Sequence, residues 1–278
     1  MAHPTDKILI VDDKKKLLLK QEKEDFIFML SHDMKNPLTA AIGSMDIMRE
    51  GRLGPVTPDQ ADYLQSAIES CEEAVVMINN LADLQRLDTG RMKFKITPVN
   101  PCALIDAAVR HFLPAAGREN ITLTLNAQTS VPEVAADSSI MSRVFENLIG
   151  NALKFVPEDG AISLTCDCIA QSNLYKTGIP PHLSDYSTKF SSAARFVRIT
   201  IADNGDGISS DDLNNISERY FLAGNASGRI RGGSGLGLAF CKKTIESFNG
   251  CIWAKNGVDE GSQLIVLMPE LGNEAINK

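Results

Sequence analysis

The chain has 278 residues, of which 44% are hydrophobic and 23% are charged. At roughly 150 residues per domain, this length predicts two domains, each with enough apolar residues for its own core. The 35 acidic and 28 basic side chains leave a net charge of −7, which argues against a protein that holds nucleic acid by charge alone.

The sequence has neither a secretory signal nor an apolar run of about 18 residues, the length that a membrane span needs. It therefore predicts a soluble, cytoplasmic protein without a membrane span, whose six cysteines are reduced thiols. Cys166 and Cys168 are the only closely spaced cysteines, and no second Cys or His pair accompanies them. A metal or redox site at this pair is therefore disfavoured.

Two helices are predicted between residues 26 and 88. Hydrophobic residues recur every three or four positions up to about Gly51, as on one side of a helix. Gly54 begins a connector, after which Thr57 and Pro58 suit the N-cap and first position of a second helix with the same repeat. The two helices form a hairpin joined by a short turn.

Such a hairpin cannot enclose a core by itself, because each helix carries only a narrow apolar stripe of the coiled-coil kind. We therefore predict a homodimer in which two hairpins pair as a four-helix bundle. The alternative is that the stripe packs on the C-terminal part of the same chain.

Strands and helices alternate from about residue 94 to residue 268. This order predicts an α/β sandwich with helices on one face of a mixed sheet. The polar stretch of residues 166–194 predicts an extended loop between two strands. The predicted helices cover residues 103–113, 138–155 and 235–249, and the predicted strands cover residues 121–125, 161–169, 196–202, 251–254 and 263–268.

His32 is the first candidate for chemistry and lies in the segment SHDMKNPL of the first helix. On a helical wheel it lies opposite the stripe of Leu30, Met34 and Leu38, so we expect its ring to be exposed. Asp33 could accept the proton on Nδ1 and thereby make Nε2 a better nucleophile. The alternative is an ordinary surface histidine.

Polar residues align on one side of the helix predicted for residues 138–155. Asn147, Asn151 and Lys154 are spaced by four and three positions, which places them on the same side. Two amides and an ammonium group suit a polyphosphate with its divalent cation, because an amide oxygen is a hard ligand for Mg²⁺. A solvated polar face would explain the same pattern.

Two glycine-containing segments complete the candidates. Asp203 begins the segment DNGDGI directly after a strand, a pattern suited to a base-binding pocket, although an Asx turn would also explain it. Residues 232–238 (GGSGLGL) open a helix, where backbone N–H groups can bind phosphate. The spacing matches neither a P-loop nor a dinucleotide fold.

Together and in this order, these motifs closely resemble the sensor histidine kinases of two-component signalling over about residues 22–269. SHDMKNPL resembles the H box, residues 147–155 the N box, DNGDGI the first G box and GGSGLGL the second G box. The resemblance implies that residues 14–90 are a dimerisation and histidine phosphotransfer domain. Residues 91–100 would be a linker, and residues 101–272 an ATP-binding domain of the Bergerat type.

The resemblance also implies roles for individual residues. His32 would accept a phosphoryl group, Asp33 would activate it, and Asn36 would orient water for dephosphorylation of a partner. Asn151 would ligate Mg²⁺. The aromatic side chain beside the lid would be Tyr220 or Phe221, because this chain lacks the Phe-Glu-Pro-Phe segment of many relatives. The residues that would bind ATP are Asn147, Asn151, Lys154, Asp203, Gly205, Gly207, Tyr220, Arg231, Gly233, Gly235, Leu236, Gly237 and Ser262.

The reaction implied is autophosphorylation of His32 from Mg-ATP, followed by transfer to an aspartate of a response regulator, with phosphatase activity as a further option. The alternatives are an ATPase of the same fold and an ATP-binding dimeric scaffold without phosphotransfer. Related ATPases have a glutamate one turn before the metal-binding asparagine, where this chain has Asn147. We predict no sensing domain, so the signal would come through the helix of residues 14–25 or from a partner protein.

Residues 1–13 contain the segment KILIVDD, which resembles the first strand and acidic pair of a receiver domain. The phosphoacceptor aspartate of a receiver has no room before His32. We therefore interpret residues 1–13 as a receiver-like stub or leader, and an ordinary apolar segment is the alternative.

Overall fold

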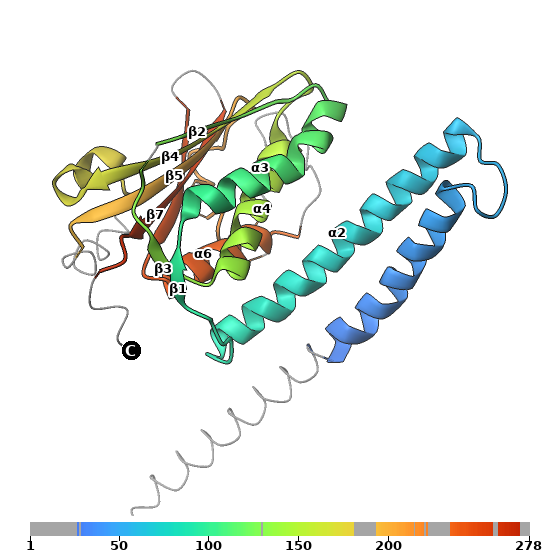
Figure 1. Ribbon diagram of the computed structural model, residues 1–278, viewed down its shortest axis with the longest axis horizontal. Helices are drawn as coiled ribbons and strands as arrows, with labels where there is room; N and C mark the ends of the chain where they lie inside the picture. Colours follow the sequence, from blue (N-terminus) through green and yellow to red (C-terminus); the bar gives the residue numbers. More distant parts are fainter. Residues whose placement is uncertain are drawn as a thin grey trace, which may run out of the picture. The chain divides into compact units, whose positions relative to one another are not determined.

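The structure is a computed structural model that describes residues 27, 29–128, 130–180, 193–213, 215–219, 221, 234–257 and 261–272. The chain divides between Arg91 and Met92 into two compact units. The N-terminal unit is a helical hairpin and the C-terminal unit is an α/β sandwich, so the predicted fold class is confirmed (Figure 1). The predicted stub and three candidates for the ATP site, Tyr220, Arg231 and Gly233, lie outside the described residues.

The hairpin consists of a first helix described over residues 29–49 and helix α2 (Pro58–Asp88). Thr57 caps α2 as predicted. Its hydroxyl accepts a hydrogen bond from the backbone N–H of Gln60 at 3.3 Å, and the Gln60 side chain accepts one from the Thr57 N–H at 3.0 Å. This capping box satisfies N–H groups that have no partner within the helix.

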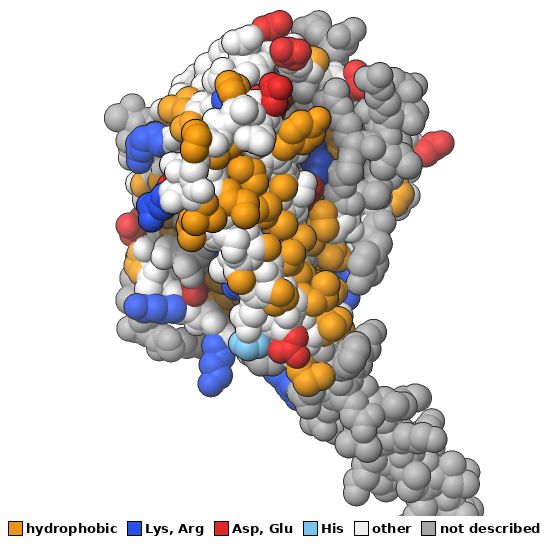
Figure 2. Space-filling view, turned by 90° about the vertical axis from the view of Figure 1, so that its right-hand side faces the viewer, with side chains coloured by type: hydrophobic (Ala, Val, Ile, Leu, Met, Phe, Trp, Pro, Cys, Tyr) orange, Lys and Arg blue, Asp and Glu red, His pale blue; other side chains and the backbone are white. Residues whose placement is uncertain are grey.

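Many large hydrophobic side chains of the hairpin are exposed. Figure 2 shows such side chains gathered over the face of the hairpin that it views. An apolar surface of this kind marks a site of association. The large hydrophobic residues of the two helices that are at least 40% exposed are Met29, Leu30, Met34, Ile47, Met48, Tyr63 and Val76.

The C-terminal unit is built on a five-stranded sheet in the order β2-β4-β5-β7-β6. β2 and β4 are parallel and the other neighbours are antiparallel, which makes the sheet mixed, as predicted. A separate two-stranded sheet of β1 and β3 was not predicted, because three residues are too few for a periodic pattern. The strands are β1 (Thr97–Val99), β2 (Thr122–Ala127), β3 (Val134–Ala136), β4 (Ala161–Ala170), β5 (Arg195–Asp203), β6 (Cys251–Asn256) and β7 (Ser262–Pro269).

Three helices, α3 (Pro101–Arg118), α4 (Ser138–Phe155) and α6 (Gly237–Ser247), cover one face of this sheet (Figure 1). The bounds of α4 are those predicted, and its apolar side is fully buried. Within the described residues, no helix has both the length and the apolar character needed to cross a membrane.

Asp137 connects the start of α4 to Lys95, near the beginning of the C-terminal unit. Its carboxylate accepts hydrogen bonds from the N–H groups of Ser139 at 3.0 Å, Ile140 at 3.3 Å and Lys95 at 2.8 Å. Burial by itself would raise the pKa of Asp137, but these bonds and one from the Ser139 hydroxyl lower it below its ordinary value. Phe94 also packs on Phe248, with ring centroids 4.9 Å apart.

The segment between β4 and β5 corrects the predicted loop of residues 166–194. Pairing with β5 continues along β4 as far as Ala170, so the prediction that the loop begins at about residue 166 is wrong. A short 3₁₀ helix, η1 (Gln171–Thr177), follows the strand. Leu174 and Ile179 pack against a hydrophobic cluster on the sheet that includes Phe196 and Trp253.

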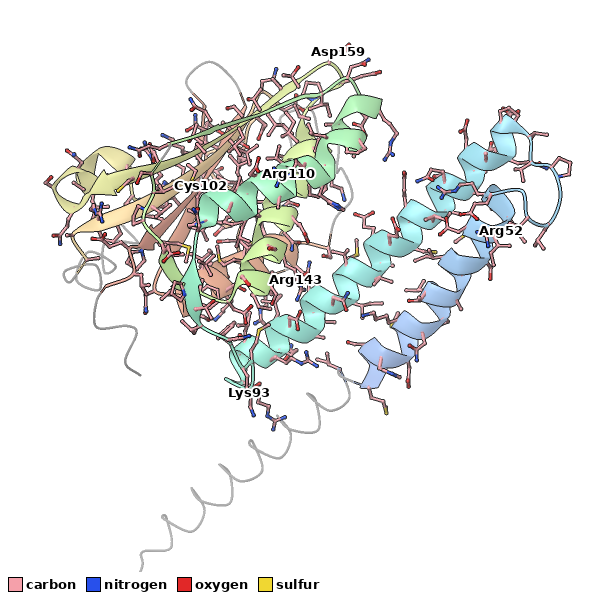
Figure 3. All side chains as sticks on the ribbon, viewed as in Figure 1. Arg52, Lys93, Cys102, Arg110, Arg143 and Asp159 are labelled. Atoms are coloured by element: carbon pink, nitrogen blue, oxygen red, sulfur yellow. A yellow bond between two sulfur atoms is a disulfide. The ribbon has the colours of Figure 1, made fainter. Side chains whose placement is uncertain are left out.

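A disulfide joins Cys102 in α3 to Cys166 in β4, with the two Cα atoms 6.1 Å apart. Figure 3 shows Cys102 at the beginning of α3. The prediction of six reduced thiols is therefore wrong for this pair. The partners are 64 positions apart and become neighbours only because α3 packs on the sheet, so cysteine spacing gave no sign of the bond.

Candidate functional site

His32 lies on the first helix of the hairpin, and its side chain is 68% exposed, as the helical wheel predicts. Asp33 Oδ1 lies 3.4 Å from His32 Nδ1, and Asn36 Nδ2 lies 3.5 Å from the same nitrogen. Both contacts are near the upper limit for a hydrogen bond. The helix thus positions two polar neighbours at Nδ1 of an imidazole that faces solvent.

The two neighbours favour opposite states of that nitrogen. Asp33 can only accept a hydrogen bond, so it favours the tautomer with a proton on Nδ1, whereas Asn36 donates to an unprotonated Nδ1. In the tautomer that Asp33 favours, the lone pair is on Nε2 and is available for nucleophilic attack. The contact with Asp33 thus favours, and the contact with Asn36 disfavours, the tautomer in which Nε2 is nucleophilic.

A second group of candidates lies on and beside α4 in the C-terminal unit. Asn147 and Asn151 are half-buried on its polar side, next to Gly237 at the start of α6. A Cβ atom at Gly237 would lie 3.0 Å from Asn147 Oδ1 and 4.0 Å from Asn151 Nδ2. A side chain at position 237 would therefore crowd the Asn147 amide but not the Asn151 amide. Lys154 is half-buried in the last turn of α4.

Asp203 forms a compact polar site at the end of β5. Its Oδ1 atom accepts hydrogen bonds from the backbone N–H groups of Gly205 at 2.9 Å and Ser262 at 3.3 Å. Its Oδ2 atom accepts one from the Ser262 hydroxyl at 2.6 Å. The sequence candidates Asp203, Gly205 and Ser262 are thus in direct contact, and the carboxylate is held in one orientation.

Helix α4 lies next to both glycine segments. At its C-terminal end, a Cβ atom at Gly205 would lie only 2.8 Å from the Phe155 carbonyl oxygen. At the level of Asn147 the helix contacts Gly237, as described above. Asn147, Gly205 and Gly237 thus lie along one helix. Gly207, Gly235 and Leu236 lie in the two loops, and Leu236 is buried.

Two residues that hold this site together were not among the candidates. Asn256 accepts a hydrogen bond from the Ile208 N–H at 2.8 Å and donates one to the Ile208 carbonyl at 2.7 Å, which fixes the loop after Asp203. Gly261 has a φ of +82°, and a Cβ atom there would lie 1.9 Å from the Asp203 carbonyl oxygen. In the sequence, Asn256 precedes Gly257, and such an Asn-Gly pair indicates a turn at the end of a strand.

A divalent cation at this site would have amide oxygens as its protein ligands. Among the described residues, no group of three or more His, Cys, Asp and Glu side chains could hold a metal ion. The amide oxygen of Asn151 is a hard ligand that suits Mg²⁺, which keeps several waters and binds phosphate oxygens as well. The residues present therefore fit a cation that arrives with a polyphosphate, and do not form a cage of their own.

Comparison with known families identifies both units. Residues 22–90 match the family described as "His Kinase A (phospho-acceptor) domain". Residues 136–272 match the family described as "Histidine kinase-, DNA gyrase B-, and HSP90-like ATPase". The two matches follow one another in the order expected from the sequence motifs. The chain belongs to the histidine kinase family.

Two curated proteins resemble this chain over most of its length. It is 25% identical over 269 residues to the alginate biosynthesis sensor protein KinB of Pseudomonas aeruginosa, a match that covers 96% of this chain and 40% of KinB. It is 28% identical over 270 residues to hybrid signal transduction histidine kinase A of Dictyostelium discoideum, covering 93% of this chain and 12% of that protein. The chain thus spans less than half of either relative.

Two solved structures share the fold. Full-length ShkA, solved in complex with AMPPNP, matches with a TM-score of 0.62 and 22% identity, over 88% of this chain and 46% of ShkA. The histidine kinase AdeS of Acinetobacter baumannii matches with a TM-score of 0.54 and 15% identity, over 87% of this chain and 98% of that chain. At these identities the likeness concerns the fold alone.

Proposed function

We propose that this histidine kinase transfers the γ-phosphoryl group of ATP to Nε2 of His32. The observation that carries the proposal is the exposed imidazole whose two polar neighbours both lie at Nδ1. Such an arrangement leaves Nε2 open to an incoming phosphoryl group. The match of residues 22–90 to a phosphoacceptor domain supports the same residue.

The proposed phosphoryl donor binds in the C-terminal unit with its adenine at Asp203. Adenine carries an exocyclic amino group, which donates hydrogen bonds, and a carboxylate is its natural acceptor. Oδ2 of Asp203 is aligned by the Ser262 hydroxyl and can accept a further bond. That ShkA was solved in complex with AMPPNP, an ATP analogue, is consistent with this role for the shared fold.

The phosphates are proposed to lie between α4 and the N-terminus of α6, beside Asn147, Asn151 and Lys154. The glycine at position 237 lets the Asn147 amide lie close to the first turn of α6. Phosphate oxygens are proposed to bind the first N–H groups of this helix, where the helix dipole favours negative charge. Mg²⁺, bound through the Asn151 amide oxygen, would neutralise phosphate charge. Lys154 would add a positive charge at the same place.

In the acceptor unit, Asp33 holds the proton on Nδ1 and disperses the positive charge that develops on the imidazole as Nε2 forms its bond to phosphorus. The γ-phosphoryl group leaves ADP, and His32 carries it as a labile N–P bond. A response regulator aspartate then takes it over. Asn36, on the next turn of the same helix, is the residue proposed to orient water for dephosphorylation of that partner.

Hydrolysis of ATP without transfer is the second candidate function. An ATPase needs a group that activates water beside the γ-phosphate, and the corresponding position here carries Asn147. Its amide donates to the Arg143 carbonyl oxygen at 2.8 Å and has no basic atom to offer. The site therefore favours transfer to a histidine over hydrolysis.

The deciding experiment incubates the full chain with Mg²⁺ and ATP labelled at the γ-phosphate. We expect a label that is lost in acid and retained in base, as befits phosphohistidine. His32→Gln should abolish the label while ADP affinity stays unchanged, and His111→Gln, which alters an exposed histidine of the C-terminal unit, should retain it. Labelling that persists in His32→Gln would reject the assignment.

We also propose that the chain is a homodimer joined through the apolar face of the hairpin, as expected of a dimerisation and phosphotransfer domain over residues 14–90. Met34 and Met48 are 46% and 45% exposed, which is costly for an isolated hairpin in water. Sedimentation at micromolar concentration should give twice the mass of the chain. Substitution of both methionines by glutamate should yield monomers, whereas glutamate at the turn residue Leu53 should not.

A further inference from the structure

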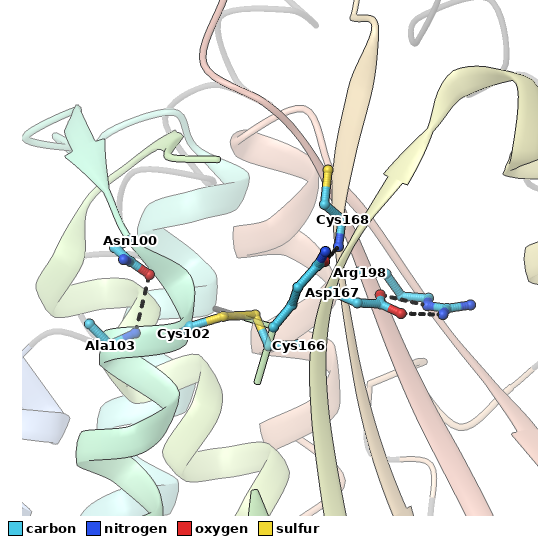
Figure 4. The surroundings of a disulfide bond; sticks show 8 residues. Asn100, Cys102, Ala103, Cys166, Asp167, Cys168 and Arg198 are labelled. Carbon is cyan, nitrogen blue, oxygen red and sulfur yellow. Dashed lines mark hydrogen bonds and ion pairs between the residues drawn. A yellow bond between two sulfur atoms is a disulfide. The ribbon is translucent and has the colours of Figure 1, made fainter. Parts of the chain in front are cut away.

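The disulfide Cys102–Cys166 ties the first turn of α3 to the middle of β4 (Figure 4). Cys102 is the second residue of α3, directly after Asn100 and Pro101, and Asn100 caps the helix by accepting from the Ala103 N–H at 3.3 Å. Cys166 is completely buried, whereas Cys102 is partly exposed. Of the two residues of the bridge, Cys102 therefore lies nearer the surface.

The other four cysteines do not form such a pair. Cys241 and Cys251 are buried, and burial raises the pKa of both thiols, that of Cys251 to about 12, so they remain protonated and unreactive. Cys71 lies in the hairpin. Cys168 shares the sheet face of Cys166, but its sulfur points away from the bridge in Figure 4. Burial raises the pKa of that thiol too.

We propose that Cys102 and Cys166 form a reversible thiol–disulfide site, which low-molecular-weight disulfides such as oxidised glutathione close and dithiols open. This site is independent of the proposed kinase reaction. Its reactants are two thiols of the chain and one disulfide molecule, and its products are the protein disulfide and two small thiols. The two protons released by the cysteines are taken up by the departing thiolates.

The burial of the two residues sets the proposed order of the steps. Cys102 reacts first, because it is the less buried residue and because the N-terminus of a helix favours the thiolate. Its thiolate attacks one sulfur of oxidised glutathione, that S–S bond breaks, and glutathione thiolate leaves. Cys166 then attacks Sγ of Cys102 and displaces the second glutathione. The backbone already holds the pair at disulfide distance, so the second step is fast.

Closure of the bridge has a defined structural effect. It fixes the start of α3 to the sheet at the point where the chain passes from β1 into the helix layer. α3 packs along α4, so the oxidised form attaches the helix layer to β4 covalently. We expect the oxidised C-terminal unit to unfold at a higher denaturant concentration than the reduced unit.

The test equilibrates the full chain, first reduced, with oxidised glutathione and counts thiols by intact mass and non-reducing peptide mapping. Wild type should form one Cys102–Cys166 link and carry no glutathione on either of these two cysteines. Cys166→Ser should retain one glutathione on Cys102, and Cys102→Ser should carry none on Cys166. Cys168→Ser, the matched control, should behave as wild type, and dithiothreitol should restore all thiols.

Two results would overturn the proposal. One is a native wild-type chain that keeps six free thiols at excess oxidised glutathione, and the other is a bridge that uses Cys168. If a serine variant does not fold, alkylation of the reduced wild-type protein tests the same order of steps. Iodoacetamide must then modify Cys102 well before Cys166, and equal rates at the two sulfurs would contradict the order of steps.

Discussion

The carboxylate of Asp203 allows the nucleotide proposal to be tested without loss of the loop that it organises. Oδ1 accepts from two backbone N–H groups, and Oδ2 accepts from the Ser262 hydroxyl. In Asp203→Asn the amide oxygen can keep the two backbone bonds, while the amide nitrogen takes the place of Oδ2. That nitrogen donates hydrogen bonds and would face the amino group of adenine, which is also a donor.

The expected loss follows from the bond that is removed. A hydrogen bond to a charged group contributes about 1.5–3 kcal/mol. Since about 1.4 kcal/mol corresponds to a tenfold change in affinity, ADP should bind roughly 10- to 100-fold more weakly. Guanine carries an acceptor oxygen where adenine has its amino group, so the variant should also lose much of the preference of the site for adenine over guanine nucleotides.

Titration calorimetry with ADP and GDP, without Mg²⁺, measures both effects and avoids any contribution from the cation. Ser262→Ala is the matched control, because it removes the 2.6 Å bond but keeps the carboxylate. It should lose less than tenfold in ADP affinity and retain the preference for adenine. If Asp203→Asn melts like wild type and binds ADP as tightly, Asp203 is not the adenine acceptor.

Three further substitutions test the packing that supports the site. Asp137→Ala should cost about 1–2 kcal/mol of unfolding free energy at neutral pH, because α4 loses its cap. The pKa of Asp137 is lower in the native than in the unfolded protein. Its carboxylate therefore stabilises the native state above about pH 4, and this stabilisation is lost as the pH falls through the native pKa. The melting curves of variant and wild type should therefore converge in acid. Cys102→Ser should destabilise the oxidised C-terminal unit to urea by about 4 kcal/mol, since the bridge spans 64 positions, and dithiothreitol should have the same effect on wild type. Gly237→Ala should displace Asn147 and weaken ADP binding about tenfold by calorimetry, about 1.4 kcal/mol, whereas Gly150→Ala, whose Cβ would meet its nearest neighbour at 3.8 Å, should not.

Features that depend on neighbours in the sequence could be predicted well. Helix α4 was predicted with its observed bounds, because its apolar period is regular. The start of α2 was predicted because Thr57 and Pro58 carry a local capping signal. Helix α3 was predicted to end at residue 113, before Pro114, but it continues to Arg118. Tertiary packing, which buries Ala116, outweighs the local cost of that proline.

Features that depend on contacts between distant residues could not be predicted from the pattern. Asp203 and Ser262 are 59 positions apart, and only the resemblance to a family placed them in one site. The disulfide partners belong to a helix and a strand whose packing no spacing rule describes. Asn256 escaped notice for the same reason, since its two bonds go to Ile208 across the loop.

The sheet itself explains why the segment after β4 packs back on it. Cys166 faces α3 through its disulfide, so Ile169, three residues further along β4, faces the opposite side. Ile169 pairs with Phe196, and both belong to the cluster that contains Trp253. Strands with apolar residues on both faces need a cover on each. Leu174 of η1 packs on this cluster, so the segment provides that cover where the helices cannot.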